Sequence, residues 1–179
     1  MKRWQRILVS VLFFVSAGAC AGKPVIVEQW ADPSRQIIER AAYRIVFEPL
    51  KTGGKSFRTF SLTLENKTAA EIEIDWNQTR YVHNQNIRGG FVFAGIEPED
   101  TKAGTIPADK VGGGETFQRE IAPQRLLAYA TIRDKSVAPG QSGINAGPVP
   151  EGRNGIALLL RMDGKEFREN LAVDIGRGK

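Results

Sequence analysis

Cysteine and histidine are almost absent from this sequence, which has one of each among 179 residues, Cys20 and His83. A single cysteine cannot close a disulfide within the chain. A zinc site needs three or four histidine, cysteine or carboxylate ligands, and an acid–base or triad mechanism that uses histidine would depend on His83 alone. His83 lies in the polar run His83-Asn84-Gln85-Asn86, which favours a solvated ring. We therefore predict no enzymatic activity, no metal site and no cofactor.

An excess of positive charge is also lacking once the N-terminus is set aside. The formal net charge is +5, but three of the basic residues, Lys2, Arg3 and Arg6, stand in the first 19 residues, which hold no acid. From Cys20 onwards, 22 basic residues are balanced by 20 acidic ones. A nucleic-acid partner would require a clustered basic face, so we expect none. The length and the 41% hydrophobic content suit one folded domain.

The N-terminal apolar stretch is too short to cross a bilayer as a helix, which takes about 20 residues. It runs from Ile7 to Val15, after the three basic residues and before the small residues Ser16 to Ala19. This order of charged, apolar and small segments is typical of a secretory signal peptide. We predict a signal peptide over residues 1–19.

Two processing patterns fit the end of this signal peptide. Ala17-Gly18-Ala19 satisfies the A-x-A preference of the general signal peptidase. Ala17-Gly18-Ala19-Cys20 also resembles the bacterial lipobox, with Ala17 where that pattern usually has Leu. In the first pattern Cys20 is an unpaired thiol in an oxidising compartment, and in the second it is the acylated first residue of the mature chain. We favour acylation of Cys20, which would attach the chain durably to a membrane.

Residues 20–42 are predicted to form the lipid-bearing tether and a short helix. Asp32 suits an N-cap and Pro33 a first helical position for a helix over Ser34–Ala42. Beyond it, apolar and polar residues alternate with the period of a β-strand. The segments predicted as strands are Phe60–Leu64, Ile72–Trp76, Phe91–Phe93, Leu126–Ile132, Ile156–Met162 and Lys165–Ile175.

The turn signals complete the predicted fold class. Asp163-Gly164 between two apolar runs is the strongest short-range mark of a β-hairpin. Glu97–Gly114 and Lys135–Gly155 are rich in proline and glycine and are predicted to be long loops. Short strands separated by such loops indicate an all-β fold. We predict an antiparallel immunoglobulin-like β-sandwich over residues 43–179.

Three segments carry a resemblance to a known group of proteins. They are Glu65-Asn66-Lys67-Thr68, Ile72-Glu73-Ile74-Asp75-Trp76-Asn77 and Met162-Asp163-Gly164-Lys165-Glu166. With the lipobox, they resemble uncharacterised bacterial lipoproteins in which an NKT turn leads into an I-x-I-x-W strand. The resemblance covers most of the chain from about Tyr43 and implies an immunoglobulin-like β-sandwich. It implies no reaction and no binding residue. By resemblance to Gram-negative lipoprotein sorting, Ala21 favours the periplasmic face of the outer membrane.

The segment from Trp76 to Phe93 is the best candidate for a binding surface, because it mixes aromatic residues with arginines and asparagines. Aromatic rings beside arginine recognise glycans, peptides and proteins. Alternation assigns the aromatic residues at its two ends to the core. Arg80, Tyr81 and Arg88 then remain as the predicted surface residues for a partner.

The leading hypothesis is a membrane-anchored, non-enzymatic interaction or accessory domain of the bacterial envelope, whose partner is an envelope protein or a glycan. The segment Trp76–Phe93 and the loop Glu97–Gly114 would form its binding surface. A carbohydrate-binding or calcium-binding module is an alternative, and so is a hydrolase that acts on envelope glycans through paired carboxylates. Candidate calcium ligands are Glu97, Glu99, Asp100 and Asp109.

Overall fold

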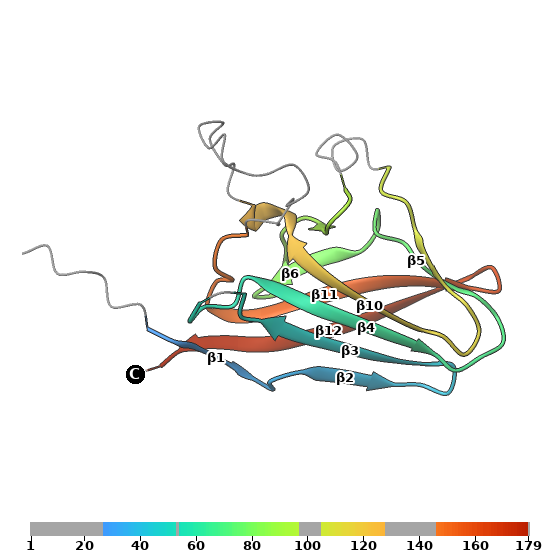
Figure 1. Cartoon of the computed structure of the whole chain (residues 1–179), viewed down its shortest axis with the longest axis horizontal. Helices are drawn as coiled ribbons and strands as arrows, with labels where there is room; N and C mark the ends of the chain where they lie inside the picture. The colour runs from blue at the N-terminus through green and yellow to red at the C-terminus, as the bar shows by residue number, and fades with distance from the viewer. Residues whose placement is uncertain (1–26, 53, 97–104, 128–145, 179) are drawn as a thin grey trace, which may run out of the picture.

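The chain forms two antiparallel β-sheets that share one hydrophobic core (Figure 1). The computed structural model describes residues 27–52, 54–96, 105–127 and 146–178. Sheet A has seven strands: β1 (Gln29–Asp32), β5 (Ile72–Ile74), β6 (Arg80–His83), β7 (Asn86–Ile87), β9 (Asp109–Val111), β11 (Gly152–Met162) and β12 (Lys165–Arg177). Sheet B has five: β2 (Gln36–Glu39), β3 (Tyr43–Leu50), β4 (Thr59–Asn66), β8 (Phe91–Val92) and β10 (Thr116–Pro123). The prediction of an all-β antiparallel fold is confirmed.

Helical structure in the described ranges is limited to a single 3₁₀ turn over Gln124–Leu126. No helix in those ranges has the length and apolarity that a bilayer span requires.

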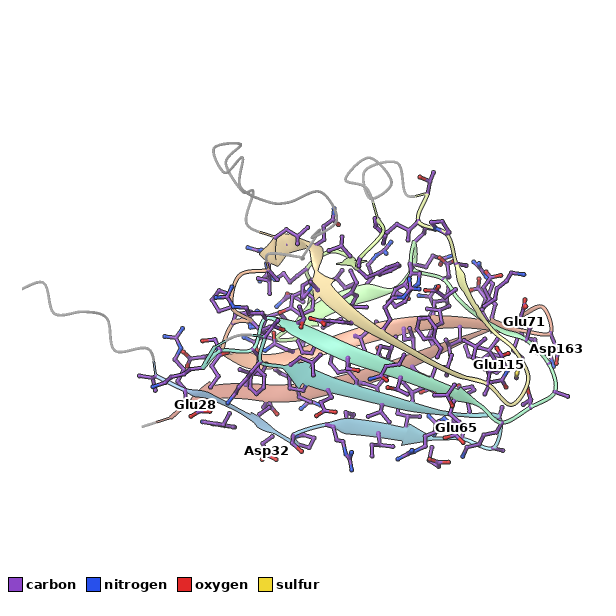
Figure 2. The ribbon with its side chains drawn as sticks, in the orientation of Figure 1. Glu28, Asp32, Glu65, Glu71, Glu115 and Asp163 are labelled. Atoms are coloured by element: carbon purple, nitrogen blue, oxygen red, sulfur yellow. The ribbon has the colours of Figure 1, made fainter. Side chains whose placement is uncertain are left out.

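The β11–β12 hairpin is the centre of sheet A. Its turn is the predicted Asp163-Gly164 pair, with φ of 50° and 72°, and Met162 pairs with Lys165 across it. Two consecutive residues with positive φ match the twist of the flanking strands, which explains why Asp-Gly marks this turn. Figure 2 shows Asp163 at the same end of the molecule as Glu71 and Glu115.

Strand β11 has two partners on its other side, placed end to end. β6 pairs with Asn154 to Ala157, and β5 pairs with Leu160 to Met162. Leu159 lies between them, where the chain leaves β5 for β6. Its carbonyl accepts from the Asp75 amide at 3.0 Å, and its amide donates to Thr79 Oγ1 at 3.2 Å. The turn between β5 and β6 therefore continues the ladder, and β6 is fixed in register.

Alternating burial along the strands explains the core. In β3, Tyr43, Ile45 and Phe47 are buried and the intervening residues are partly exposed. The Phe47 ring stacks on Phe60 of β4 at 4.6 Å between ring centroids. Fully burying a side chain of this size stabilises the fold by about 1.5–3 kcal/mol. Trp76, Phe91 and Phe93 are also buried, so the assignment of the aromatic residues of the Trp76–Phe93 segment to the core is confirmed for these three.

The predicted helix over Ser34–Ala42 is wrong. Its middle is strand β2, which pairs with β3 from Gln36 opposite Phe47 to Glu39 opposite Arg44. A helix this short is marginal without tertiary support, whereas the β-branched pair Ile37-Ile38 suits the free edge of an eight-residue strand. Strands β1 and β2 also extend both sheets N-terminal to Tyr43, where we placed the start of the sandwich.

Two further segments differ from the sequence prediction. The Glu97–Gly114 segment, predicted as a loop, contains β9, which pairs with β5; residues 97–104 of this segment lie outside the described ranges. β9 is three residues long and places Lys110 opposite Glu73, so its sequence lacks an alternating apolar signal. The predicted strand Leu126–Ile132 begins in the 3₁₀ turn, and its remainder from residue 128 lies outside the described ranges.

Asn66, the first residue of the Asn-Lys-Thr turn, joins the two sheets. Its side chain is buried, and Nδ2 donates to the carbonyls of Ala70, Val111 and Gly112 at 2.7, 3.0 and 3.0 Å. Its Oδ1 accepts from the amide of Thr68 at 3.0 Å. The Asn66 side chain therefore hydrogen-bonds to backbone groups of the segment between β4 and β5 and to backbone groups at the end of β9.

The Asn66→Ala substitution is expected to lower the free energy of unfolding by about 2–3 kcal/mol, because it leaves several buried backbone groups without a partner. Urea denaturation of the variant and the parent protein measures the loss. Asn170→Ala on the exposed face of β12 is the matched control and should change stability by less than about 0.5 kcal/mol. Equal stability of the two variants would contradict this role of Asn66.

Glu169 is a buried carboxylate with two partners. Arg40 donates to it through Nε at 2.8 Å and Nη2 at 3.0 Å, and the Tyr43 hydroxyl donates at 2.9 Å. The Arg40 hydrogen bond holds the pKa of Glu169 below its ordinary value of 4.5, with help from Tyr43 and against the effect of burial. Burial is the main reason that the pKa of Tyr43 rises to about 12, so its hydroxyl stays a donor at neutral pH.

A lowered carboxyl pKa stabilises the fold above the unfolded-state pKa, and that stabilisation is lost as the pH falls through the folded-state value. Glu169→Gln should therefore lower the free energy of unfolding by about 1–2 kcal/mol at neutral pH, and this difference from the parent should shrink as the pH falls below the ordinary value of 4.5 and through the lowered pKa of Glu169. Denaturation at several pH values measures this. The exposed ion pair Glu151–Arg177, at 2.9 Å, provides the control. Glu151→Gln should lower the free energy of unfolding by less than about 0.5 kcal/mol. If Glu169→Gln lowers the free energy of unfolding by the same amount at every pH, the ionised Glu169 carboxylate is not the source of the stabilisation.

Candidate interaction surfaces

The three residues predicted to contact a partner do not share one environment. Tyr81 is 1% exposed, packs edge-on against Phe91 at 5.9 Å and donates its hydroxyl hydrogen bond to Asn154. Its placement on the surface is therefore wrong, because alternation along β6 turns it inward. Burial raises its pKa, and the positive charges of Arg125 and Arg88 act in the opposite direction. The neutral phenol is thus a structural donor.

Arg80 and Arg88 are at the surface, Arg80 next to Tyr81 along β6 and Arg88 opposite Tyr81 across the hairpin. Arg80 is partly exposed and donates through Nη1 to the carbonyls of Asn77 and Thr79 at 2.7 and 3.0 Å. Arg88 is exposed, and its amide donates to the Tyr81 carbonyl at 2.8 Å. Among the described ion pairs none involves Arg80 or Arg88. The Arg80 guanidinium is therefore positioned by backbone carbonyls, and Arg88 is held in the ladder through its main-chain amide.

Ile87 is the residue that sequence reasoning missed. It lies in β7 and is 68% exposed, more than any other large hydrophobic residue of the described ranges. It pairs with Val82, so the two side chains lie on the same face of the hairpin, together with Arg80 two residues before Val82. We call Arg80, Ile87 and Arg88 the hairpin surface; Arg88, one residue after Ile87 and opposite Tyr81, extends from the other face of the edge strand. The sequence does contain a signal for this hairpin, because the apolar residues Val82 and Ile87 stand on either side of a polar turn.

The tip of this hairpin is held rigidly. Asn84 and Gln85 form its turn, with φ of 47° and 66°. Asn84 Oδ1 accepts from the Arg153 amide at 2.9 Å, and a Cβ on Gly152 would lie 2.5 Å from that oxygen, so only glycine fits there. The His83 ring, which we predicted to be solvated, lies with Nε2 2.9 Å from the Glu151 carbonyl oxygen. Both contacts fix the tip to the start of β11.

A shallow hollow of about 210 Å³ adjoins the hairpin on the outer face of sheet A. Val82 and Gln85 line it from the hairpin, and Gly155 and Ala172 line it from β11 and β12. Ile87 and Arg80 lie on the same face as Val82, which lines this hollow, and Arg88 adds a positive charge on the other side of the edge strand. Arginine and large apolar side chains are typical of the residues that contribute most to protein–protein binding.

A second exposed surface surrounds Trp30 of β1, at the opposite edge of sheet A. The indole ring is 50% exposed and lies over Gly176, where a Cβ would be 2.3 Å from Cζ2. Its Nε1 donates to the Arg177 carbonyl at 3.1 Å. Beside it opens a groove of about 490 Å³, lined in part by Glu28, Lys51 and Phe57. We missed Trp30 because residues 20–42 were assigned to a tether and helix, although the alternation Gln29-Trp30-Ala31 turns the indole outward.

The order of strands separates the two surfaces. β1 pairs with β12, β12 with β11, β11 with β6 and β6 with β7. At about 4.8 Å per strand, β1 and β7 are about 19 Å apart. Trp30 and the hairpin surface therefore belong to opposite edges of one sheet.

The residues predicted for calcium do not form a described site. Glu97, Glu99 and Asp100 lie outside the described ranges. Asp109 accepts from Trp76 Nε1 at 2.7 Å and pairs with Arg119 at 3.0 Å. Within the part of the chain that the structure describes, no cluster of three His, Cys, Asp or Glu could hold a metal ion. Cys20, the predicted acylation site, also lies outside it.

Comparison with known proteins adds no relative to this description. A scan of protein-family models found no match to the chain, and searches of curated proteins and of solved structures found none either.

Proposed function

We propose that this protein is a lipoprotein of the bacterial cell envelope, anchored through Cys20 on the periplasmic face of the outer membrane. Its two sheets form a non-enzymatic interaction or accessory domain that binds another envelope protein through the hairpin surface. The observation that carries the proposal is Ile87, an apolar side chain 68% exposed on a hairpin whose tip is fixed by Asn84, with Arg80 on the paired strand and Arg88 next in sequence. The anchor is supported by the Ala17-Gly18-Ala19-Cys20 pattern after a signal-peptide sequence.

An immunoglobulin-like arrangement of the sandwich is part of this proposal. It is supported by the two antiparallel sheets around one core and by the N-terminal strands, which extend sheet A with β1 and sheet B with β2. In such sandwiches, loops and strand edges vary while the core is retained, so binding surfaces commonly lie there.

The chemistry of the hairpin surface favours a protein over a glycan. A glycan site needs an exposed aromatic face for sugar stacking, and Tyr81, the aromatic residue nearest to this surface in sequence, is buried. An exposed isoleucine beside arginines fits an apolar pocket bordered by carboxylates on a partner protein. Because the tip is already fixed by Asn84, little conformational freedom is lost on binding.

Ile87→Ser combined with Arg88→Glu is expected to reduce recovery of the partner at least about tenfold, the effect of losing roughly 1.4 kcal/mol of binding energy. Crosslinking in intact cells followed by co-purification from membranes measures this recovery. The melting temperature should stay the same, because both side chains are exposed. Lys165→Glu, a charge reversal at an exposed residue beside the Asp163-Gly164 turn, is the matched control and should leave recovery unchanged. Equal recovery from the two variants would exclude the hairpin surface.

Cys20→Ser is expected to move the protein from the membrane fraction to the soluble periplasm, because each buried acyl methylene contributes about 0.8 kcal/mol of membrane affinity. Metabolic labelling with a radioactive fatty acid and cell fractionation measure the change, and only the parent protein should carry label. A soluble, unlabelled parent whose thiol reacts with maleimide would instead support the general signal peptidase and a free Cys20.

A further inference from the structure

The large apolar side chains left exposed are unevenly distributed over the described residues. Val27, Trp30 and Ile37 are 37%, 50% and 38% exposed, and all three belong to the N-terminal segment that contains β1 and β2. β1 is the edge strand of sheet A and β2 the edge strand of sheet B. In Figure 1 these two blue strands follow the same side of the molecule. We call this side the N-terminal edge.

The N-terminal edge is also where the chain enters the domain from Cys20. Seven peptide units join Cys20 to Val27, and a fully extended chain covers at most about 3.6 Å per residue, so Val27 lies within about 25 Å of an acylated Cys20. Trp30 is three residues further along. An anchored domain therefore holds Trp30 within about 36 Å of the acylated residue, so the exposed ring can reach the bilayer surface.

We infer that the N-terminal edge rests on the lipid headgroup layer, with the Trp30 ring inserted into it and the hairpin surface at the opposite edge of sheet A, about 19 Å away across the strands. The inference depends on the anchoring through Cys20 proposed above. Tryptophan is enriched at membrane–water interfaces, where its ring meets the acyl boundary and its polar edge stays satisfied. The Trp30 N–H already donates to Arg177, so the exposed ring presents an apolar face without an unpaired donor.

The charges beside Trp30 set the character of this contact. Glu28 is paired with Lys51 at 2.7 Å, and Figure 2 shows Glu28 and Asp32 along the N-terminal edge, one on each side of Trp30 in sequence. Acidic residues do not draw a surface to anionic lipids. The contact should therefore depend on the indole ring, occur with zwitterionic lipid and persist in high salt.

The sequence supplies a built-in probe for a fluorescence experiment. After loss of residues 1–19, which contain Trp4, the chain has two tryptophans, Trp30 and Trp76. Trp76 is 1% exposed, so iodide in the aqueous phase reports on Trp30. The acylated full-length protein is reconstituted into phosphatidylcholine vesicles, and the Cys20→Ser form in solution is the unanchored reference. Brominated phosphatidylcholine then provides quenching from the lipid side.

Anchoring is expected to reduce iodide quenching of Trp30 at least about threefold and to introduce quenching by the brominated lipid, at low and high salt alike. Trp30→Phe should remove both signals while the protein stays on the vesicles and keeps its melting temperature. This variant assigns both quenching signals to Trp30 and not to Trp76.

Three results would overturn the inference in distinguishable ways. If the protein floats with the vesicles but iodide still quenches Trp30 fully, the anchoring through Cys20 is supported and the inferred contact of Trp30 with the membrane is wrong. If the protein does not float with the vesicles, both the anchoring through Cys20 and the membrane contact are wrong. Protection of Trp30 in the soluble Cys20→Ser form by N-acetylglucosamine oligomers, without protection by vesicles, would assign the groove to a glycan.

Discussion

The antiparallel ladder between β11 and β12 is the constraint on which the rest of the structure depends. It runs without interruption from Gly152 opposite Ile175 to Met162 opposite Lys165. Three strands of sheet A attach to it directly, β1 on β12 and β5 and β6 on β11, and β9 and β7 attach through β5 and β6. A shift of one residue in this ladder would turn Leu158, Leu160, Leu171 and Val173 away from the core. It would also displace both surfaces, because β1 and β6 take their positions from it.

Buried polar side chains then join the sheets in a domain whose described part contains no cysteine. Asn66 connects the end of β4 to the chain around β5 and β9, while Glu169 of β12 takes hydrogen bonds from Arg40 and Tyr43. In the described ranges, no buried side-chain nitrogen or oxygen lacks a hydrogen-bond partner. Such complete pairing matters because an unpaired buried group costs about 1–3 kcal/mol, and this fold has several polar groups in its core.

Local signals in the sequence predicted the parts of the fold that local physics determines. Asp163-Gly164 specified its turn, and alternation placed strands at Phe60 and Ile72 and put Trp76 and Phe91 in the core. The helix prediction over Ser34–Ala42 failed because Asp32-Pro33 is a good helix start in isolation. The segment instead pairs with β3, which begins four residues after β2 ends, and a helix signal within Ser34–Ala42 does not include that following partner.

The candidate sites could be predicted only in part for the same reason. Arg80 and Arg88 were identified from composition, but composition does not give the side of a strand on which a residue lies. Register with β11 buried Tyr81 and left Ile87 exposed at the edge. Trp30 required the knowledge that β1 pairs with β12, which brings the indole over Gly176 across 146 residues of sequence.

The placement of the two surfaces on opposite edges of one sheet links the proposed anchor to the proposed partner. A tether alone holds a domain near a membrane but leaves it free to rotate, so a binding surface would face a partner only part of the time. Contact of the N-terminal edge with the headgroup layer would remove much of that rotation before any partner arrives. The hairpin tip is fixed to the start of β11 through Asn84, and the β11–β12 ladder fixes β11 relative to β1. Orientation at one edge would thereby be transmitted to the other as a rigid body, and it would lower the entropic cost of association.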